Sequence, residues 1–471
     1  MSTQRSLTQE IARFVVETKF EDIPKIVVHE AKRTLLDSVG CALAGIVTDK
    51  GKISIKLARK LGGPPESSII GVGDKVSCCN AAFANGELIN ALDYDAVHFP
   101  PGHVSPFVIP PPLAVAESIK APGKDLLLAI ILGHEISLRI SSALTAFAAF
   151  IPEEAEKGAV KSAPVLGYGQ CIFGGTAGAG KILKLDHKKM THALGIAGHI
   201  CSVPSIRKWE ETVPLAMTKY ESAGWLSTGG VTAALLAEMG YVGDTTILDG
   251  EYGFWRFFGS ERWDPDVITE KIGEKWLFSE TKYKFYPCCH CMHSSLDCFN
   301  SIIDKNNLMP EEIESVKVFC HPLIERPIWR NNELASNIDA QFSVAYVFAA
   351  AAHRVKLEDW QDLDIIKNKK ILEFMKKVNY QAHPKFAEGR PRSSFGMVEV
   401  MAKGEIFREE RKYAKGTSFT DFKATDEELI EKFKRNASRI LTRDKIDEAI
   451  KSLLDLEKLE NIAELTMQIT L

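Results

Sequence analysis

The chain has 471 residues, of which 45% are hydrophobic and 25% are charged, and its formal net charge is −4 at pH 7. This composition is typical of a globular protein with two or three domains and ample core material. No basic stretch is long enough to indicate a nucleic-acid-binding surface. No apolar run approaches the roughly 18 residues that a membrane helix needs. We therefore expect neither nucleic acid nor a membrane as a partner.

The N-terminus and the cysteines indicate a compartment. The first residues, MSTQRSLTQEIARF, are polar and then amphipathic, without the apolar centre of a signal peptide. Ten cysteines in a long chain without such a signal are most simply reduced thiols. The sequence therefore predicts a cytoplasmic protein.

Residues 7 to about 260 have the hydrophobic spacing of helices. The clearest expected helices are 124–144, 167–185, 187–199 and 228–239. Small residues in 37–45 and 167–185 predict helices that pack closely. Glu135 and Arg139 are four residues apart, a spacing that is also common for a surface ion pair. Strand signals are almost absent, which argues against a doubly wound α/β domain.

The pattern changes near Glu280. Residues 283–289 are predicted to be extended, 316–320 alternate as in a strand, and 397–401 and 406–413 are predicted to form paired strands. Helices are expected at 294–303, 340–351 and 363–378. This mixture predicts a smaller α+β domain of about 130 residues, within the usual size range of domains. From residue 426 the spacing is helical again, so the chain end is expected to return to the first domain.

One loop concentrates groups suited to proton transfer. Residues 90–112 read NALDYDAVHFPPGHVSPFVIPPP, so Asp93 and Asp95 are followed by a Pro-Pro-Gly turn and His103. Prolines and glycine predict a fixed loop, and residues 108–119 a buried helix. Acids and imidazoles on a rigid loop suit acid/base chemistry. The alternative is a polar turn whose acids cap a helix.

Two further motifs partly resemble binding sites, one for a phosphate and one for a metal. Residues 175–181, GTAGAGK, are one residue short of a phosphate-binding loop, and Ile182 stands where a hydroxyl is needed, so a closely packed helix is the preferred interpretation. Residues 286–293, YPCCHCMH, hold three cysteines and two histidines. Their spacing does not suit a zinc or iron–sulfur site. This stretch, with Lys284, is instead expected to line a cleft between the two domains.

Cations in small or apolar surroundings are candidates for binding an anion. Lys219, in MTKYESAGW, and Arg207 with Lys208 are such groups. A buried cation is costly unless it is paired, and an anionic ligand is one way to pair it. Solvent-exposed positions remain the alternative for each, and Tyr346 is either a core or a cleft residue.

Seven segments in order support a family resemblance: LDSVGCALAG, ALDYDAVH, TKYESAGW, ILDGEYGFW, KFYPCC, DAQFSVAY and KGTSFTDF. Over nearly its whole length, the chain resembles the MmgE/PrpD family of 2-methylcitrate dehydratases, cis-aconitate decarboxylases and iminodisuccinate epimerases. The resemblance implies a mainly α protein with a smaller α+β lid. The large helical domain would comprise 1–279 and 416–471, and the inserted lid 280–415. It also implies a homodimer that needs no cofactor and no metal, with its active site between helical domain and lid.

The resemblance also assigns roles. The catalytic residues would be His103 as acid/base, Asp93, Lys284 and Tyr346; the substrate-binding residues would be Lys219, Arg207, Cys289 and His290. The chain departs from the family pattern in three places: at Val97, where many members have a hydroxyl, at Cys289, where decarboxylases have a histidine, and near Val165, where they have another.

The expected activity is that of a dehydratase-type lyase. It would move a proton next to a carboxylate of a small di- or tricarboxylate such as 2-methylcitrate. Decarboxylation and epimerisation, of a cis-aconitate-like or iminodisuccinate-like substrate, stay open as outcomes. Two interpretations of other classes also stay open. One is a metal- or redox-sensing protein using Cys288, Cys289 and Cys291, and the other is a carboxylate-binding protein without turnover.

Overall fold

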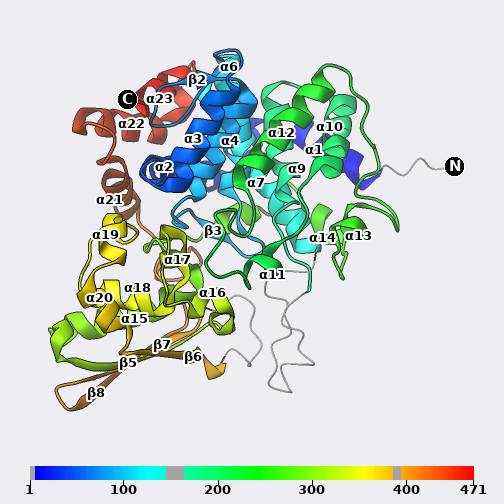
Figure 1. The fold of residues 1–471 in the computed structure, drawn as a ribbon. Coiled ribbons are helices and arrows are strands. Elements are labelled where there is room, and N and C mark those ends of the chain that lie inside the picture. Colours follow the sequence, from blue (N-terminus) through cyan, green and yellow to red (C-terminus); the bar gives the residue numbers. More distant parts are fainter. Residues whose placement is uncertain (1–5, 145–163, 386–393) are drawn as a thin grey trace.

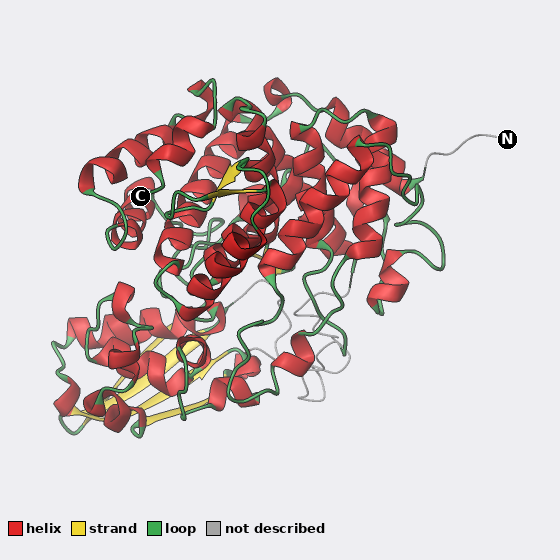
Figure 2. Ribbon diagram, turned by 45° about the horizontal axis from the view of Figure 1, so that its top comes forward, coloured by secondary structure: helices red, strands yellow, loops and turns green. Residues whose placement is uncertain are grey.

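The computed structural model describes residues 6–144, 164–385 and 394–471. Most of the chain is helical, and a four-stranded sheet lies at one end (Figure 1). Figure 2 shows the strands gathered at that end, apart from short ladders among the helices. We call residues 293–411, which contain the four-stranded sheet, the sheet region, and the remainder the helical region. The prediction of a mainly α protein with a smaller part that contains a sheet is confirmed.

The helical region is built from both ends of the chain. Its helices are α1 (Leu7–Glu17), α2 (Lys25–Gly45), α3 (Asp49–Leu61), α4 (Cys78–Asn90), α5 (Ser105–Val108), α6 (Pro110–Ser118), α7 (Gly123–Ala143), α9 (Cys171–Ile182), α10 (His187–Ile200), α11 (Ile206–Trp209), α12 (Ala223–Glu238), α13 (Phe254–Phe258), α14 (Asp266–Thr269), α21 (Asp426–Ala437), α22 (Arg443–Leu454) and α23 (Ala463–Gln468). Two ladders lie between them: β1 (Ser67–Ser68) with β2 (Lys75–Val76), and β3 (Val97–His98) with β4 (Gly102–His103). The sequence did not predict these short ladders.

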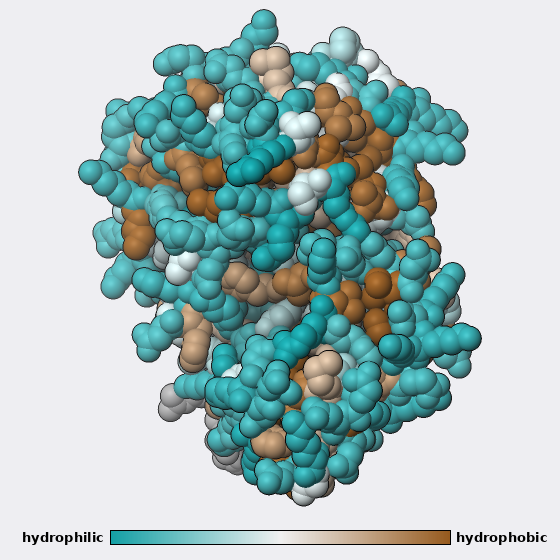
Figure 3. All heavy atoms as spheres, turned by 90° about the vertical axis from the view of Figure 1, so that its left-hand side faces the viewer, coloured by the Kyte–Doolittle hydropathy of each residue, from teal (hydrophilic) through white to brown (hydrophobic). Residues whose placement is uncertain are grey.

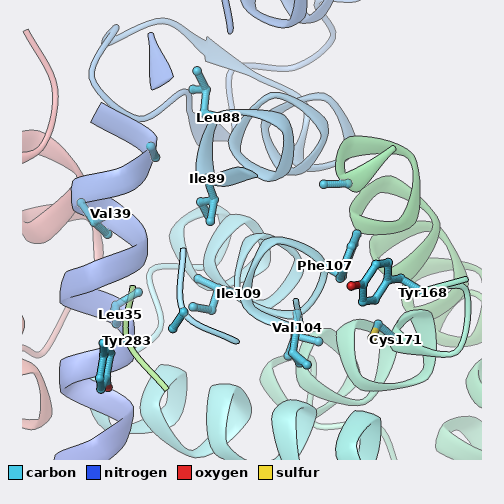
Figure 4. Packing of buried hydrophobic residues seen from close by; sticks show 14 of the residues in the cluster. Leu35, Val39, Leu88, Ile89, Val104, Phe107, Ile109, Tyr168, Cys171 and Tyr283 are labelled. Atoms are coloured by element: carbon cyan, nitrogen blue, oxygen red, sulfur yellow. The ribbon is translucent and has the colours of Figure 1, made fainter. Parts of the chain in front are cut away.

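Small residues let the central helices approach closely, as predicted. A Cβ atom added to Gly174 of α9 would lie 2.1 Å from the carbonyl oxygen of Gly133 in α7. One added to Gly86 of α4 would lie 2.7 Å from the hydroxyl of Ser227 in α12. Figure 4 shows apolar side chains of α2, α4 and the segments around α5 and α9 facing one interior. Each large aliphatic or aromatic side chain buried there contributes about 1.5–3 kcal/mol.

Two features of α7 were not expected from the sequence: the length of its apolar stretch and the burial of an ion pair. It is the one helix in the described ranges that is long and apolar enough to cross a membrane, although 94% of its apolar window is buried inside the protein. That burial is typical of a core helix. Glu135 and Arg139 also lie inside, since their side chains are 0% and 2% exposed and their ion pair spans 2.7 Å. Arg139 further donates to the carbonyls of Ile268 and Glu270, and these hydrogen bonds offset the cost of burying its charge.

The face of the molecule drawn in Figure 3 is mostly hydrophilic. Figure 3 shows one face, on which apolar side chains gather in patches between larger polar areas. Single exposed apolar residues are normal in folded proteins, whereas contiguous patches often mark interaction sites.

The GTAGAGK stretch lies in α9, in agreement with the prediction of a packed helix. The Nζ atom of Lys181 donates to the carbonyls of Val15, Val16 and Thr18, each at 2.8 Å. The last carbonyls of a helix lack partners within that helix, so Lys181 completes the C-terminus of α1. The lysine of this near-match to a phosphate-binding loop therefore has a structural role.

The sheet region contains β5 (Ile313–Cys320), β6 (Val378–Ala382), β7 (Gly396–Ala402) and β8 (Glu405–Arg411), with helices α15 (His293–Lys305), α16 (Pro327–Arg330), α17 (Asn337–Phe342), α18 (Val344–Ala352), α19 (Leu363–Ile366) and α20 (Lys369–Met375). The strand order is β6-β5-β7-β8, and β5 pairs with β6 in parallel and with β7 antiparallel. Figure 1 shows α15 and α18 between this sheet and the helical region.

The paired strands near 397–413 are confirmed as β7 and β8, and the strand near 316–320 as β5. The prediction of one helix over 363–378 was wrong, because α19 and α20 are separate and Val378 begins β6. The parallel partner of β6 is β5, which lies far away in the sequence, so local spacing did not reveal the strand. The helix expected over 340–351 is divided at Ser343, whose hydroxyl caps α18.

Candidate active site

The loop after α4 folds back so that its acids and His103 meet. Asp93 follows the end of α4 with φ 54°, a left-handed conformation in which aspartate is tolerated better than most residues. Strands β3 and β4 then pair, and His103 lies opposite Val97. Gly102 has φ 123°, and a Cβ atom there would lie 2.5 Å from the Tyr168 hydroxyl. Only glycine fits this turn, so the Pro-Pro-Gly sequence directs His103 back over the acids.

Asp93 is held between two lysines from distant parts of the chain. Its Oδ1 atom accepts from the Nζ atom of Lys219 at 2.9 Å, and its Oδ2 atom accepts from the Nζ atom of Lys284 at 2.6 Å. The hydroxyl of Tyr220 also donates to Oδ1, at 2.9 Å. The three charged side chains are each at most 1% exposed. A buried carboxylate thus gathers two cations at one point.

His103 lies between the two acids. Its Nδ1 atom is 2.6 Å from Oδ2 of Asp95, and its Nε2 atom is 3.4 Å from Oδ1 of Asp93. The ring stacks on Tyr220, with centroids 4.8 Å apart, and meets the edge of Tyr168. These contacts fix both the plane and the direction of the imidazole.

The electrostatics of the cluster favour charged lysines around an ionised Asp93. Burial would raise the pKa of Asp93, but Lys219, Lys284 and His103 outweigh it and hold this pKa well below its usual range. Burial lowers the pKa of Lys219 to about 8, although Asp93 opposes this effect. For Lys284, burial also acts against the charge, yet Asp93 and Asp95 outweigh it and raise the pKa. Lys219 is therefore the lysine whose charge is lost first as pH rises.

Both regions support the loop that carries Asp93. Lys432 of α21 forms a buried ion pair with Asp37 of α2 at 2.6 Å and donates to the carbonyl of Tyr94 at 2.7 Å. From the sheet region, Gln341 donates to the carbonyl of Ala91, at 2.8 Å. The side chain of Gln361 donates to the carbonyls of Leu92 and Pro287, both at 2.8 Å. The cluster therefore lies where the two regions meet.

His290 and Cys289 lie at the same junction. The ring of His290 is 5.9 Å from that of Phe99, in the β3–β4 turn, and its buried Nε2 atom has no hydrogen-bond partner among the described residues. Burial, reinforced by neighbouring groups that include His293 and Lys284, lowers the pKa of His290 well below its usual range, so this imidazole is neutral. The Cys289 thiol is partly exposed, and a hydrogen bond from Cys291 lowers its pKa although burial opposes this.

Arg207 and Tyr346 have other partners. The guanidinium of Arg207 pairs with Glu210 at 2.8 Å, and Arg326 pairs with the same carboxylate at 3.2 Å. Tyr346 is 1% exposed, and its hydroxyl donates to the carbonyl of Trp360. Glu210 and Trp360, the partners named here, lie outside the Asp93 cluster. The structure brings together His103, Asp93, Lys219 and Lys284.

Sequence reasoning missed two tyrosines and the connection of Asp95 to His103. Tyr220 follows Lys219 directly, just before a glycine-containing helix. Its position beside a candidate cation was the feature of the sequence that could have identified it as a site residue. Tyr168 is the central residue of the GYG sequence that precedes α9, and no motif indicates its contact with His103. The cysteine-rich stretch offers no clear metal site: in the described ranges, no group of three or more histidine, cysteine or acidic residues could hold a metal ion.

Comparisons with known proteins match two long stretches of the chain to one family. Residues 9–266 match the MmgE/PrpD N-terminal domain, and residues 286–456 match the MmgE/PrpD C-terminal domain. The chain belongs to the MmgE/PrpD family. Similar proteins include cis-aconitate decarboxylases from Homo sapiens (26% identical, covering 98% of this chain and 94% of the relative) and Aspergillus terreus (25%, covering 98% and 96%). The Mus musculus cis-aconitate decarboxylase is 25% identical, with 98% and 93% covered. The prediction of a lyase of the MmgE/PrpD family is confirmed.

The pKa of Lys219 gives a testable pH dependence for this MmgE/PrpD protein. Because the pKa of Lys219 is about 8, this side chain loses its charge above that pH, and kcat/KM for an anionic substrate is expected to fall. The fall should approach tenfold for each pH unit. The measurement is kcat/KM between about pH 6.5 and 9.5. Arginine stays protonated throughout, so Lys219→Arg should move this decline to higher pH. An unchanged decline in Lys219→Arg would assign it to another group.

Proposed function

We propose that this protein is a decarboxylating lyase of a small unsaturated tricarboxylate such as cis-aconitate. The observation that carries the proposal is the convergence of Lys219, Lys284 and His103 on one buried carboxylate, Asp93. Two lysines suit the carboxylates of the substrate, and the imidazole suits proton transfer. The names of the similar proteins support this choice over the dehydration preferred from the sequence.

The proposed reaction has two steps. Cleavage of the carbon–carbon bond to one carboxylate releases carbon dioxide and leaves the electron pair on the substrate carbon. This pair delocalises through the double bond into a remaining carboxylate, whose developing charge lies against Lys219 and Lys284. The doubly protonated imidazole of His103 then gives its Nε2 proton to the carbon, becomes neutral, and regains that proton from water. The product is an unsaturated dicarboxylate with one proton more and one carboxylate fewer.

Asp93 has a second part in this proposal, as a substitute for the substrate. It accepts hydrogen bonds from the Nζ atoms of both lysines, which keeps two buried ammonium groups paired. A substrate carboxylate shares or takes over these contacts when it binds. The lysines are thereby prepared for a carboxylate before the substrate arrives, which lowers the cost of ordering them.

Dehydration of a hydroxy acid such as 2-methylcitrate is the second candidate. The hydroxyl of Tyr220, 2.9 Å from Asp93 on a ring stacked against His103, is a proton donor that a leaving hydroxide would need. Epimerisation of an iminodisuccinate-like acid requires the same proton abstraction and no leaving group. All three outcomes share the acid/base group and differ in the bond that breaks.

A substrate panel separates these outcomes. The protein is incubated in heavy water with cis-aconitate, 2-methylcitrate, citrate or an iminodisuccinate-like acid, and proton NMR follows the products. We expect a dicarboxylate carrying deuterium at the protonated carbon, and stoichiometric carbon dioxide, from cis-aconitate. Loss of water from 2-methylcitrate would favour the second candidate. Absence of both turnover and deuterium uptake with every acid would overturn the lyase site and leave a carboxylate-binding protein.

We further propose that the inserted part of the chain closes over the substrate as a lid and that the protein is a homodimer in the cytoplasm. Gln341 and Gln361, which hold the loop before Asp93, support closure because they connect the two regions at the site. Exposed apolar side chains in and after α12 support dimerisation, among them Trp225 at 58% and Met239 at 78%. Light scattering tests the dimer.

A further inference from the structure

The two acids of the loop have different surroundings. Asp93 is surrounded by two lysines and the Tyr220 hydroxyl. Asp95 is 0% exposed, and the ion pair found for it in the described part of the chain is with Nδ1 of His103, at 2.6 Å. Its other oxygen accepts from the side-chain amide of Asn90, at 3.1 Å. Asp93 therefore organises the cations, whereas Asp95 is directed at the imidazole.

These contacts determine where the His103 ring carries its proton. A carboxylate only accepts hydrogen bonds, so the short contact with Asp95 requires a proton on Nδ1 of His103. The titratable groups around this ring lie on its own loop and on three other segments: Asp93, Asp95, Tyr168, Tyr220 and His290. None of the other four contacts Nδ1 in the described ranges, and the side-chain amide nitrogen of Asn90 lies 3.5 Å from Nδ1, much farther than the Asp95 oxygen at 2.6 Å. Asp95 is thus the group that fixes the tautomer.

We propose that Asp95 is a positioning residue, which holds the proton of His103 on Nδ1 and leaves Nε2 as the atom that exchanges a proton with the substrate. The tautomer assignment stands on the geometry alone, and its effect on rate rests on the proposed function. Nε2 is the nitrogen that points toward Asp93, where Lys219 and Lys284 would hold the substrate carboxylate. The reacting carbon would then lie beside Nε2.

Replacing Asp95 with asparagine should reverse the tautomer. Asn90 donates to one oxygen of Asp95, so the new amide would turn its oxygen toward Asn90 and its N–H group toward Nδ1. Nδ1 must then accept, and the proton moves to Nε2. A histidine in the wrong tautomer lowers kcat by about 10²- to 10⁴-fold.

Histidine NMR tests the tautomer without turnover. The protein is labelled with ¹⁵N in its 12 histidines, and the signal of His103 is identified by its absence in His103→Gln. We expect a protonated Nδ1 in the wild type, a protonated Nε2 in Asp95→Asn, and a return to Nδ1 with partial recovery of kcat in Asp95→Glu. A protonated Nδ1 that persists in Asp95→Asn would overturn the proposal.

Asp37→Asn is the matched control. Asp37 is another fully buried acid that supports the same loop, through the backbone N–H of Ala96 and Lys432. Its replacement should lower stability while the Nδ1 proton of His103 stays in place. If Asp37→Asn changed the tautomer as Asp95→Asn does, general disturbance of the loop would explain both, and Asp95 would have no specific role.

If the tautomers behave as expected but no substrate turns over, the proposed function fails and the positioning of His103 stands.

Discussion

His103→Gln is expected to lower kcat by about 10²-fold or more on the substrate that the protein turns over. Glutamine has a similar length and can accept or donate hydrogen bonds toward Asp93 and Asp95, so the loop should keep its shape. It has no group that titrates near neutral pH and transfers a proton. The binding of substrate to the lysines should remain, so KM should change much less than kcat.

His98→Gln separates this chemical effect from damage to the loop. His98 lies in β3, and its Nε2 atom is 2.9 Å from the hydroxyl of Thr281. It is buried like His103 and lies on the same small ladder, but it touches neither acid in the contacts of the described residues. A folded His103→Gln protein with wild-type kcat, or an equal loss in His98→Gln, would remove His103 from the mechanism.

Lys284→Met is expected to have the second large effect, on both catalysis and stability. Methionine keeps the apolar length of lysine but leaves Lys219 as the one lysine paired with Asp93 among the described residues. Loss of one cation at the developing carboxylate charge should lower kcat/KM by about 10²- to 10³-fold. Breaking a fully buried ion pair should lower the free energy of unfolding by about 3 kcal/mol. Steady-state kinetics and urea unfolding measure the two effects.

Lys432→Met provides the comparison. Lys432 is also a buried lysine with a carboxylate partner at 2.6 Å, and it donates to the carbonyl of Tyr94 next to Asp93. It supports the loop from α21 and does not contact Asp93. Lys432→Met should therefore lose a similar free energy of unfolding, whereas kcat/KM of the folded protein falls by less than about tenfold. Equal kinetic losses in both variants would show that Lys284 acts through stability alone.

The sequence predicted the parts of the fold that depend on local periodicity. Long helices such as α7, α9 and α10 follow the spacing of their apolar residues, and β7 and β8 follow alternation around a tight turn. It did not predict β6, because that strand forms through a parallel partner far away in the chain. Burial of the Glu135–Arg139 pair was missed for a related reason, since carbonyls from residues 268–275 satisfy the guanidinium.

The sequence predicted several residues of the candidate site but not the contacts between them. Asp93, His103, Lys219 and Lys284 were identified from motifs, and the structure brings them into one cluster. The motifs did not indicate that one carboxylate would pair with both lysines, because that depends on the left-handed turn at Asp93 and on where Lys219 and Lys284 approach it. Tyr220 and Asp95 act through contacts made by folding, and neither has a spacing that reveals its partner.

The central claim is that Lys219 and Lys284 receive a substrate carboxylate beside His103. A crystal structure of the slow His103→Gln variant with cis-aconitate tests it most directly. We predict one substrate carboxylate within hydrogen-bonding distance of the Nζ atoms of Lys219 and Lys284, with a neighbouring carbon in contact with the side chain at position 103. A ligand bound elsewhere, with both lysines still paired to Asp93 alone, would contradict this claim.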